Sequence, residues 1–206
     1  MKKWGAVLAV IAISTSATAG GYFTWHKHLN YNFGTISEGK VYKLAAINPE
    51  KLKKYTDEYG IKTIIDLRNE ITKYPSEELS AAADAIEGLN YINIRSKQTP
   101  DKHTLTAFYQ VLDNPDNYPV LIHCYHGLGR TMLYTALYRI EYEGVSNEEA
   151  RSKTRWLVES PIYDSSFAKG KSEGDFLINY KPRTMGMQST LQTIATYESN
   201  PLRVRG

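Results

Sequence analysis

Cys124 and Arg130 are the two residues whose types and spacing point most directly to chemistry. Five residues separate them, within the stretch 120–131, Val-Leu-Ile-His-Cys-Tyr-His-Gly-Leu-Gly-Arg-Thr. The apolar start of this stretch predicts a buried strand and the residues after Arg130 predict a helix, so a loop with two glycines would join them. The N–H groups of such a loop and the positive end of the helix favour an anion, and the same field favours a thiolate. The stretch therefore predicts a nucleophilic cysteine and a cradle of phosphate size in one loop.

Four residues of this stretch match the signature His-Cys-x5-Arg-Ser/Thr, namely His123, Cys124, Arg130 and Thr131. At these positions the chain resembles the cysteine-dependent protein-tyrosine phosphatases, in particular the compact dual-specificity type. The segment 41–44, Val-Tyr-Lys-Leu, extends the resemblance to their bacterial exported members. The resemblance implies that the Cys124 thiolate attacks phosphorus, that Arg130 and the loop amides hold the equatorial oxygens, and that water then hydrolyses a cysteinyl-phosphate. It also implies that no metal and no cofactor takes part. His123 would orient the loop by hydrogen bonding, and the Thr131 hydroxyl would help the sulfur leave.

The rest of the loop is expected to line the substrate site, mainly through backbone N–H groups, and comprises Tyr125, His126, Gly127, Leu128 and Gly129. Together with Arg130 and Thr131 these residues form the predicted substrate-binding set. An arginine suits the end of the loop because its planar fork can bind two phosphate oxygens at once. The imidazole of His126 would either assist the binding of polyanionic substrates or face solvent, and the sequence leaves both interpretations open.

The resemblance also implies a general-acid aspartate on an upstream loop, here within 95–102. Gln98 falls near the usual place of the acid, and an amide cannot give up a proton at neutral pH. The neighbouring carboxylate is Asp101, which is a candidate for the catalytic acid and also for the N-cap of a helix whose apolar positions include Leu105 and Phe108. General-acid assistance is worth roughly 10² to 10⁴ in rate. A site without it would favour aryl phosphates such as phosphotyrosine, because a phenol, with a pKa of about 10, leaves more easily than an alkoxide.

The elements that must position these residues alternate between strand and helix patterns. Strands are predicted at 41–44, 61–67, 91–94 and 120–123, and helices at 49–59, 76–87, 105–112, 130–143, 146–157 and 187–197. This order predicts one α/β domain whose mainly parallel sheet has about four to five strands flanked by helices, as in dual-specificity phosphatases. Asp66 and Arg68 would lie at the carboxyl end of a central strand, where open α/β sheets bind ligands, or they would pair with each other.

Residues 1–25 form a candidate leader ahead of a phosphatase domain that comprises 26–206. Lys2 and Lys3 precede an apolar run, which is typical of an export signal. The residues at 17–19 offer a small-x-small cleavage site, whereas the aromatic residues that follow extend the run to about the length that spans a bilayer. A cleaved signal peptide and an uncleaved transmembrane anchor both stay open. Either predicts an exported domain, periplasmic or tethered to the inner membrane and facing the extracytoplasmic side.

Composition and charge disfavour several classes of function. The chain has 25 Lys and Arg residues against 22 Asp and Glu residues, and this near balance gives no support for nucleic-acid binding. With a single cysteine, the chain forms no intramolecular disulfide. Arsenate reduction and thiol redox chemistry are disfavoured as well, since both commonly use a second cysteine.

The sequence as a whole predicts a phosphomonoester hydrolase that acts on phosphotyrosine, or with dual specificity, in protein substrates. Two alternatives stay open. A phosphoinositide or other phospholipid phosphatase would share the chemistry but would be expected to have a more basic loop. A catalytically weak phosphate-binding module would account for an absent acid, although Cys124, Arg130 and Thr131 together argue for an enzyme. The sequence favours no particular oligomeric state.

Overall fold

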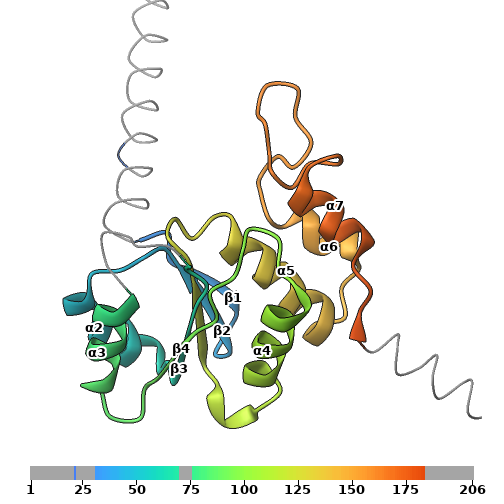
Figure 1. The fold of residues 1–206 in the computed structure, drawn as a ribbon. Coiled ribbons are helices and arrows are strands. Elements are labelled where there is room, and N and C mark those ends of the chain that lie inside the picture. Colours follow the sequence, from blue (N-terminus) through green and yellow to red (C-terminus); the bar gives the residue numbers. More distant parts are fainter. Residues whose placement is uncertain (1–20, 22–30, 70–75, 184–206) are drawn as a thin grey trace, which may run out of the picture. The chain divides into compact units, whose positions relative to one another are not determined.

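The computed structural model describes residues 21, 31–69 and 76–183, and the chain divides into two units, 1–131 and 132–206 (Figure 1). The predicted leader, apart from Gly21, and the helix predicted over 187–197 lie outside the described residues. Among the residues that are described, no helix combines the length and the apolar character that a membrane span requires.

The first unit is built on a five-stranded sheet in the order β1-β2-β5-β3-β4. Its strands are β1 (Gly34–Ser37), β2 (Val41–Leu44), β3 (Thr63–Asp66), β4 (Asn90–Asn93) and β5 (Val120–His123). The four neighbouring strands β2, β5, β3 and β4 run parallel to one another, whereas β1 runs antiparallel to β2 along the edge. The mainly parallel sheet predicted from the alternation of elements is therefore confirmed. All four residues of β5 are buried, so the strand that leads to Cys124 is the centre of the sheet.

Helices cover both faces of this sheet within the first unit. On one side lie α2 (Pro49–Tyr59) and α3 (Ser76–Asp84), and on the other lies α4 (Lys102–Leu112), which is followed by the 3-10 helix η2 (Pro115–Asn117) (Figure 1). Both ends of α2 carry residues that are typical of helix ends. The Asn48 side chain caps the start by accepting from the Glu50 N–H at 2.9 Å, and Gly60 ends the helix at a φ of 62°. The helix α3 was predicted to extend to residue 87 but ends at Asp84, because residues 85–88 form turns before β4.

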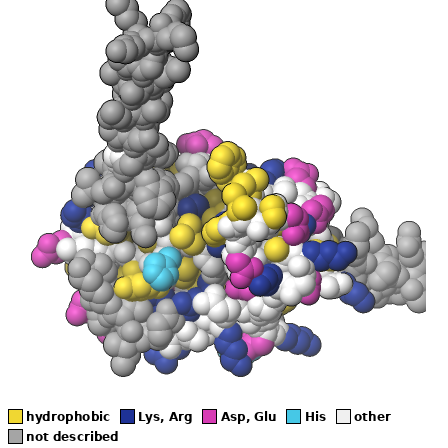
Figure 2. All heavy atoms as spheres, turned by 90° about the horizontal axis from the view of Figure 1, so that it is seen from above, with side chains coloured by type: hydrophobic (Ala, Val, Ile, Leu, Met, Phe, Trp, Pro, Cys, Tyr) yellow, Lys and Arg dark blue, Asp and Glu magenta, His cyan; other side chains and the backbone are white. Residues whose placement is uncertain are grey.

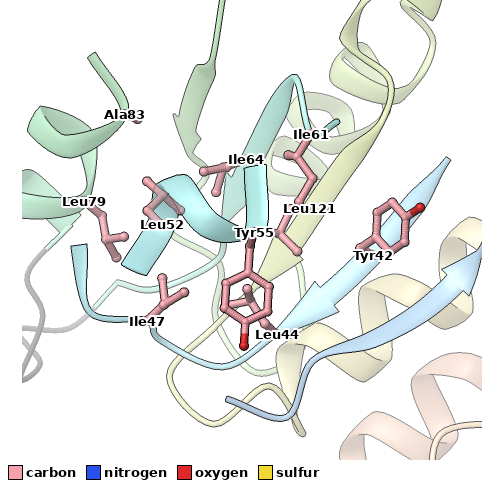
Figure 3. Close-up of a cluster of buried hydrophobic side chains, with 10 residues drawn as sticks. All are labelled: Tyr42, Leu44, Ile47, Leu52, Tyr55, Ile61, Ile64, Leu79, Ala83 and Leu121. Atoms are coloured by element: carbon pink, nitrogen blue, oxygen red, sulfur yellow. The ribbon is translucent and has the colours of Figure 1, made fainter. Parts of the chain in front are cut away.

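A core cluster of the first unit joins the sheet to α2 and α3 (Figure 3). Its buried side chains are Tyr42, Leu44, Ile47, Leu52, Tyr55, Ile61, Ile64, Leu79, Ala83 and Leu121. Burying one large apolar side chain stabilises a fold by roughly 1.5 to 3 kcal/mol, so these contacts hold β2, β3 and β5 firmly against the helices. The carboxyl ends of the three parallel strands consequently meet at one edge, where Leu44 and Asp66 both lie in register with His123.

The helix α5 (Arg130–Tyr142) begins at the loop that follows β5 and continues into the second unit. Its apolar residues at helical spacing, Leu133, Ala136, Leu137 and Ile140, are all buried. The helix ends just before Gly144, whose φ of 70° marks the stop that the sequence predicts.

The second unit also contains α6 (Asn147–Ser152), which starts as predicted and ends early. Ser146 caps it by accepting from the Glu149 N–H at 3.2 Å. The predicted continuation to residue 157 is wrong, because the buried Arg151 donates to Glu159 Oε1 at 2.6 Å and to the Phe167 carbonyl at 2.7 Å. These bonds draw the following chain back toward the helix and leave Trp156 96% exposed.

The sequence analysis did not identify α7 (Ser172–Asn179). Its N-cap residue, Lys171, makes no side-chain capping bond, so the usual start signal is missing. Gly174 allows this helix to pack closely, because a Cβ there would lie 2.1 Å from the Ala168 carbonyl oxygen.

Candidate active site

The loop 124–129 joins β5 to α5 as predicted and places Cys124 and Arg130 at its two ends. Cys124 is 3% exposed and Arg130 is 6% exposed, so both residues lie below the surface. Gly127 has a φ of 67°, and a Cβ there would lie 2.8 Å from backbone atoms of Leu44 and Ala45 at the end of β2. The loop therefore requires glycine at this position for its backbone conformation and for its close approach to β2.

Two carbonyl groups of the loop are engaged by donors outside it. The Ala46 N–H donates to the Tyr125 carbonyl at 2.9 Å, and Asn32 Nδ2 donates to the His126 carbonyl at 2.8 Å. In a trans peptide the C=O and the following N–H point to opposite sides, so the N–H groups of His126 and Gly127 are turned away from these donors. An anion cradle needs this orientation. The sequence analysis identified neither Asn32 nor Ala46 as part of the site.

The Arg130 guanidinium is anchored to the residues that follow β3 and β4. Nη1 donates to the Leu67 carbonyl at 2.9 Å, to Asn69 Oδ1 at 3.0 Å and to the Ser96 carbonyl at 3.2 Å. These acceptors follow β3 and β4, so two neighbouring strand ends together fix the place and plane of the guanidinium. Sequence reasoning missed all three. Two are backbone carbonyls, which carry no residue-specific signal, and the third, the Asn69 side chain, is 61 positions away along the chain.

Asp66 and Arg68 pair with each other beneath the loop, which is one of the two arrangements that the sequence left open. Both side chains are fully buried, and Arg68 Nη2 donates to Asp66 Oδ2 at 2.7 Å. Asp66 Oδ2 also accepts from Ser76 Oγ at 2.9 Å and from the Tyr91 hydroxyl. Burial alone would raise the pKa of Asp66, but the charge that His123 carries when protonated and the hydrogen bonds of Arg68 hold this pKa well below its usual range. Asp66 is therefore an anion at neutral pH, unsuited to donate a proton.

His123 is buried directly before the nucleophile, and its Nε2 lies 3.7 Å from Asp66 Oδ1. Burial lowers the pKa of His123 below its ordinary value, against the opposing influence of Asp66. Within the described part of the chain, neither ring nitrogen makes a hydrogen bond of normal geometry. The structure therefore does not show the hydrogen bond by which His123 was predicted to orient the loop; it shows a packed imidazole, whose neutral form is favoured by burial.

Thr131 follows Arg130 in the first turn of α5 and is completely buried. Its hydroxyl has no hydrogen-bond partner among the described residues. A buried hydroxyl without a partner costs about 1 to 3 kcal/mol, which is consistent with a group kept for the reacting atoms. The role predicted for Thr131 in the departure of the sulfur stays a prediction.

Asp101 is the N-cap of α4, as one of the two predictions for it states. Its Oδ1 accepts from the Thr104 N–H at 2.9 Å and from the Thr104 hydroxyl at 3.1 Å. These bonds hold the pKa of Asp101 below its ordinary value. The carboxylate is thus ionised at neutral pH and committed to a helix end, so the geometry gives no support to its predicted role as catalytic acid.

Gln98 lies against the far end of the loop. Its Oε1 is 3.2 Å from the point where a Cβ on Gly129 would lie. The residue that sequence comparison puts near the usual place of the acid is thus beside the phosphate loop, and it carries an amide.

The outward side of the loop presents Tyr125, His126 and Leu128 to solvent. Tyr125 is 38% and Leu128 43% exposed, and the Tyr125 ring meets the His126 ring edge-on at a centroid distance of 4.5 Å. His126 is exposed to solvent, and the part predicted for it in binding polyanionic substrates stays a prediction. On the face drawn in Figure 2, Lys and Arg side chains are interspersed with Asp and Glu side chains.

A thiol and an anchored guanidinium at the two ends of a glycine-bearing loop, between a central parallel strand and a helix, form a site for a tetrahedral oxyanion. The fold and this loop together define the class of cysteine-dependent phosphatases. Comparison with known families agrees, since residues 35–170 match the family described as DSP-PTPase phosphatase fused to NAD+ kinase. The match covers more than half of the chain, which therefore belongs to this family. A comparison with curated proteins found no match.

Solved structures share the fold at low sequence identity. The core catalytic domain of the PP-IP phosphatase SIW14 from S. cerevisiae is 21% identical, with a TM-score of 0.58 over 79% of this chain and 93% of that one. TpbA from P. aeruginosa is 17% identical, with a TM-score of 0.57 over 79% of this chain and 92% of that one. A variant of TpbA in complex with pTyr is 16% identical, with a TM-score of 0.55 over 79% and 91%.

Proposed function

We propose that this chain hydrolyses phosphate monoesters of phenols, phosphotyrosine in proteins in particular, through a cysteinyl-phosphate intermediate. The observation that carries the proposal is the loop between Cys124 and Arg130. It has a buried thiol at one end, an anchored guanidinium at the other, and outer carbonyls tied away from its interior. Each of these features favours the binding of a tetrahedral dianion next to a nucleophile.

The reaction proceeds in two displacements. The Cys124 thiolate attacks phosphorus, and the S–P bond forms as the bond from phosphorus to the phenolic oxygen breaks. The loop amides and Arg130 stabilise the charge on the equatorial oxygens, and the amino end of α5 adds to that field. Water then attacks the cysteinyl-phosphate, the S–P bond breaks, and inorganic phosphate and the thiolate are released. The Thr131 hydroxyl is the group we assign to the departing sulfur.

The preference for aryl esters follows from what lies beside the loop. Gln98 offers an amide, and Asp101 is an ionised cap, so neither supplies the proton that an alkoxide leaving group needs. General-acid assistance is worth roughly 10² to 10⁴ in rate. Phenols, with a pKa of about 10, depart with far less help than aliphatic alcohols.

The rim of the loop also favours an aryl group over a polyanionic head group. Between Cys124 and Arg130 the basic side chain is His126, and its neighbours Tyr125 and Leu128 are exposed and apolar or aromatic. A phosphoinositide or another polyphosphate would gain from Lys or Arg side chains at these positions. Exposed aromatic and apolar surface instead suits contact with a tyrosine ring.

Turnover of p-nitrophenyl phosphate by the wild type and by Cys124→Ser tests the proposal. We expect hydrolysis by the wild type, none by the variant, and retained phosphate binding by both. With phosphopeptides, kcat/KM for phosphotyrosine is expected to exceed that for phosphoserine by at least about 100-fold. Equal rates on the two peptides, or a preference for phosphoinositide vesicles, would contradict the substrate class. A folded wild type that binds phosphate without turnover would identify a binding module.

We also propose that the domain works outside the cytoplasm, because residues 1–25 have the pattern of an export signal or anchor. Fractionation of cells that produce the full chain, with and without residues 1–25, tests this. The full chain should be found in the membrane or the extracytoplasmic fraction, and the shortened chain in the cytoplasm. Identical distribution of both chains would contradict the proposal.

A further inference from the structure

We propose that Asp66 and Asn93 are positioning residues that hold the Arg130 guanidinium in its place through the backbone of residues 66–68. The inference rests on the proposed function, since it concerns the geometry of the same site. Asp66 and Asn93 belong to the sheet next to the loop, and the proposal assigns them a role in positioning Arg130. It thereby also explains the buried ion pair of Asp66 and Arg68, which takes no direct part in the reaction.

The first step concerns where Arg130 finds its acceptors. Among the described residues, two groups that accept from Nη1, the Leu67 carbonyl and Asn69 Oδ1, belong to the segment that leaves β3. The position of this segment therefore sets the position of the guanidinium. Displacements of about 1 Å in a catalytic group cost as much as 10²-fold in rate, so whatever fixes the segment also sets the rate.

The second step concerns Asn93, which ties this segment to β4. Its Nδ2 donates to the Asp66 carbonyl at 3.0 Å and to the Arg68 carbonyl at 2.9 Å. Successive carbonyls of an extended chain point to opposite sides. With the carbonyls of Asp66 and Arg68 held toward β4, the carbonyl of Leu67 between them is directed the other way, where it accepts from Arg130 Nη1.

The third step concerns the Asp66 carboxylate, which accepts hydrogen bonds within residues 66–68. Oδ1 accepts from the Arg68 N–H at 2.9 Å and from Arg68 Nε at 2.9 Å. At the same point the Leu67 N–H donates to the His123 carbonyl at 2.9 Å, which joins the segment to the residue that precedes the nucleophile. The carboxylate therefore fixes one turn of backbone that contacts both ends of the phosphate loop.

The energetics favour a role in geometry over a role in stability. Asp66 and Arg68 are completely buried, and a buried ion pair can often be replaced by apolar residues at little cost, because its desolvation offsets its attraction. What such a pair supplies is a specified arrangement of hydrogen bonds. Here that arrangement is the one that directs the Leu67 carbonyl at Arg130.

Asn93→Ala is the main test, with Asn90→Ala as its matched control at the opposite end of the same strand. We expect Asn93→Ala to lower kcat/KM for p-nitrophenyl phosphate by roughly 10-fold to 100-fold, with most of the loss in kcat, while the control stays within about twofold. Melting curves should show both variants folded. An unchanged kcat for Asn93→Ala, in an active wild type, would overturn the inference and leave the proposed function intact.

A double-mutant cycle separates positioning from a general weakening of the fold. Inorganic phosphate binding is measured by calorimetry for the wild type, Asn93→Ala, Arg130→Ala and the double variant. If Asn93 acts through Arg130, its substitution weakens phosphate binding in the wild type and has no further effect once Arg130 is absent. Additive losses would overturn the inference. Because this readout needs no turnover, it stands even if the proposed function fails.

Asp66→Asn completes the test, accompanied by the double substitution Asp66→Asn and Arg68→Gln, which leaves no unpaired buried charge. Both are expected to lower kcat as Asn93→Ala does, and the doubly substituted protein should be the better folded of the two. Should Asp66→Asn fail to fold, the doubly substituted protein and Asn93→Ala decide the outcome. Wild-type kcat in a folded double variant would exclude Asp66.

Discussion

The phosphate loop has two contrasting surroundings, a buried, hydrogen-bonded floor and an exposed rim. The floor consists of Asp66, Arg68 and Asn93, which are tied into a dense set of hydrogen bonds at the carboxyl ends of β3 and β4. The rim consists of Gln98, Tyr125, His126 and Leu128, which are exposed. We propose that the floor sets the position of the reacting groups and that the rim selects the substrate. Substitutions in the floor should therefore change kcat for every substrate, whereas substitutions in the rim should change the ranking of substrates.

The largest effect in this comparison is expected for Arg130→Lys. Lysine keeps the charge but lacks the planar fork, and it cannot reach the Leu67, Asn69 and Ser96 acceptors and the substrate together. We expect kcat/KM for an aryl phosphate to fall by about 10² to 10³. Arg139→Lys, on the same helix, is the matched control and should stay near the wild type. A loss below about tenfold would show that the anchored guanidinium does not control the rate.

Gly127→Ala should be the next most severe change, and it acts through the fold of the loop. The added Cβ would meet the β2 backbone at 2.8 Å in a residue with a φ of 67°. We expect a loss of about 2 to 4 kcal/mol in the free energy of unfolding, measured by denaturant titration, together with reduced activity. Gly39→Ala has nearly the same φ, 66°, but no atom within 4 Å, and should cost only about 1 kcal/mol. Equal losses would mean that backbone strain alone, without the contact to β2, accounts for Gly127.

Gln98→Asp tests the rim, and it is expected to raise activity. A carboxyl group beside Gly129 would offer a proton to a departing alkoxide, so turnover of alkyl phosphates should rise by roughly tenfold while aryl phosphates change little. The measurement is the dependence of kcat/KM on leaving-group pKa, which should become shallower. Gln110→Asp, at an exposed position of α4, is the control. An unaltered dependence would show that Gln98 does not face the leaving group.

The smallest effect is expected for Asp101→Asn, because asparagine also caps helices well. Activity on phosphotyrosine should stay within about twofold of the wild type; a loss of 10²-fold or more would restore Asp101 to the role of acid. Asp101→Ala should lower Tm at pH 7. Since hydrogen bonds from Thr104 hold the pKa of Asp101 below its ordinary value, the ionised form stabilises the fold. That contribution is complete above the ordinary pKa and disappears as pH falls through the lower folded value, so the difference in Tm should vanish in strong acid.

The sequence predicted the reacting loop well because local rules govern it. The apolar run of β5, the glycine at 127 and the Arg130–Thr131 start of α5 each carry a local signal that the structure confirms. The caps at Asn48 and Ser146 were predictable for the same reason.

What the sequence could not predict are partners distant in the chain or elements without a local signal. Arg130 donates to groups 34 to 63 positions away in the chain, and two of them are backbone carbonyls. The side chains of those residues give no signal from which these bonds could be predicted. The edge strand β1 has a half-exposed pattern, and α7 lacks a capping side chain. The premature end of α6 depends on the bonds that Arg151 makes to residues much later in the chain.

Asn32 shows that residues N-terminal to the sheet also support the phosphate loop. It precedes β1, yet its side chain donates to His126, and its carbonyl accepts from Lys43 Nζ at 2.8 Å. Its neighbour Tyr31 accepts from the Ala45 N–H at 2.6 Å. A fragment trimmed to residue 35, where the family match begins, would keep nearly all of the sheet but would leave a peptide of the phosphate loop untethered. A fragment that keeps this tether on the phosphate loop must therefore start at or before Tyr31.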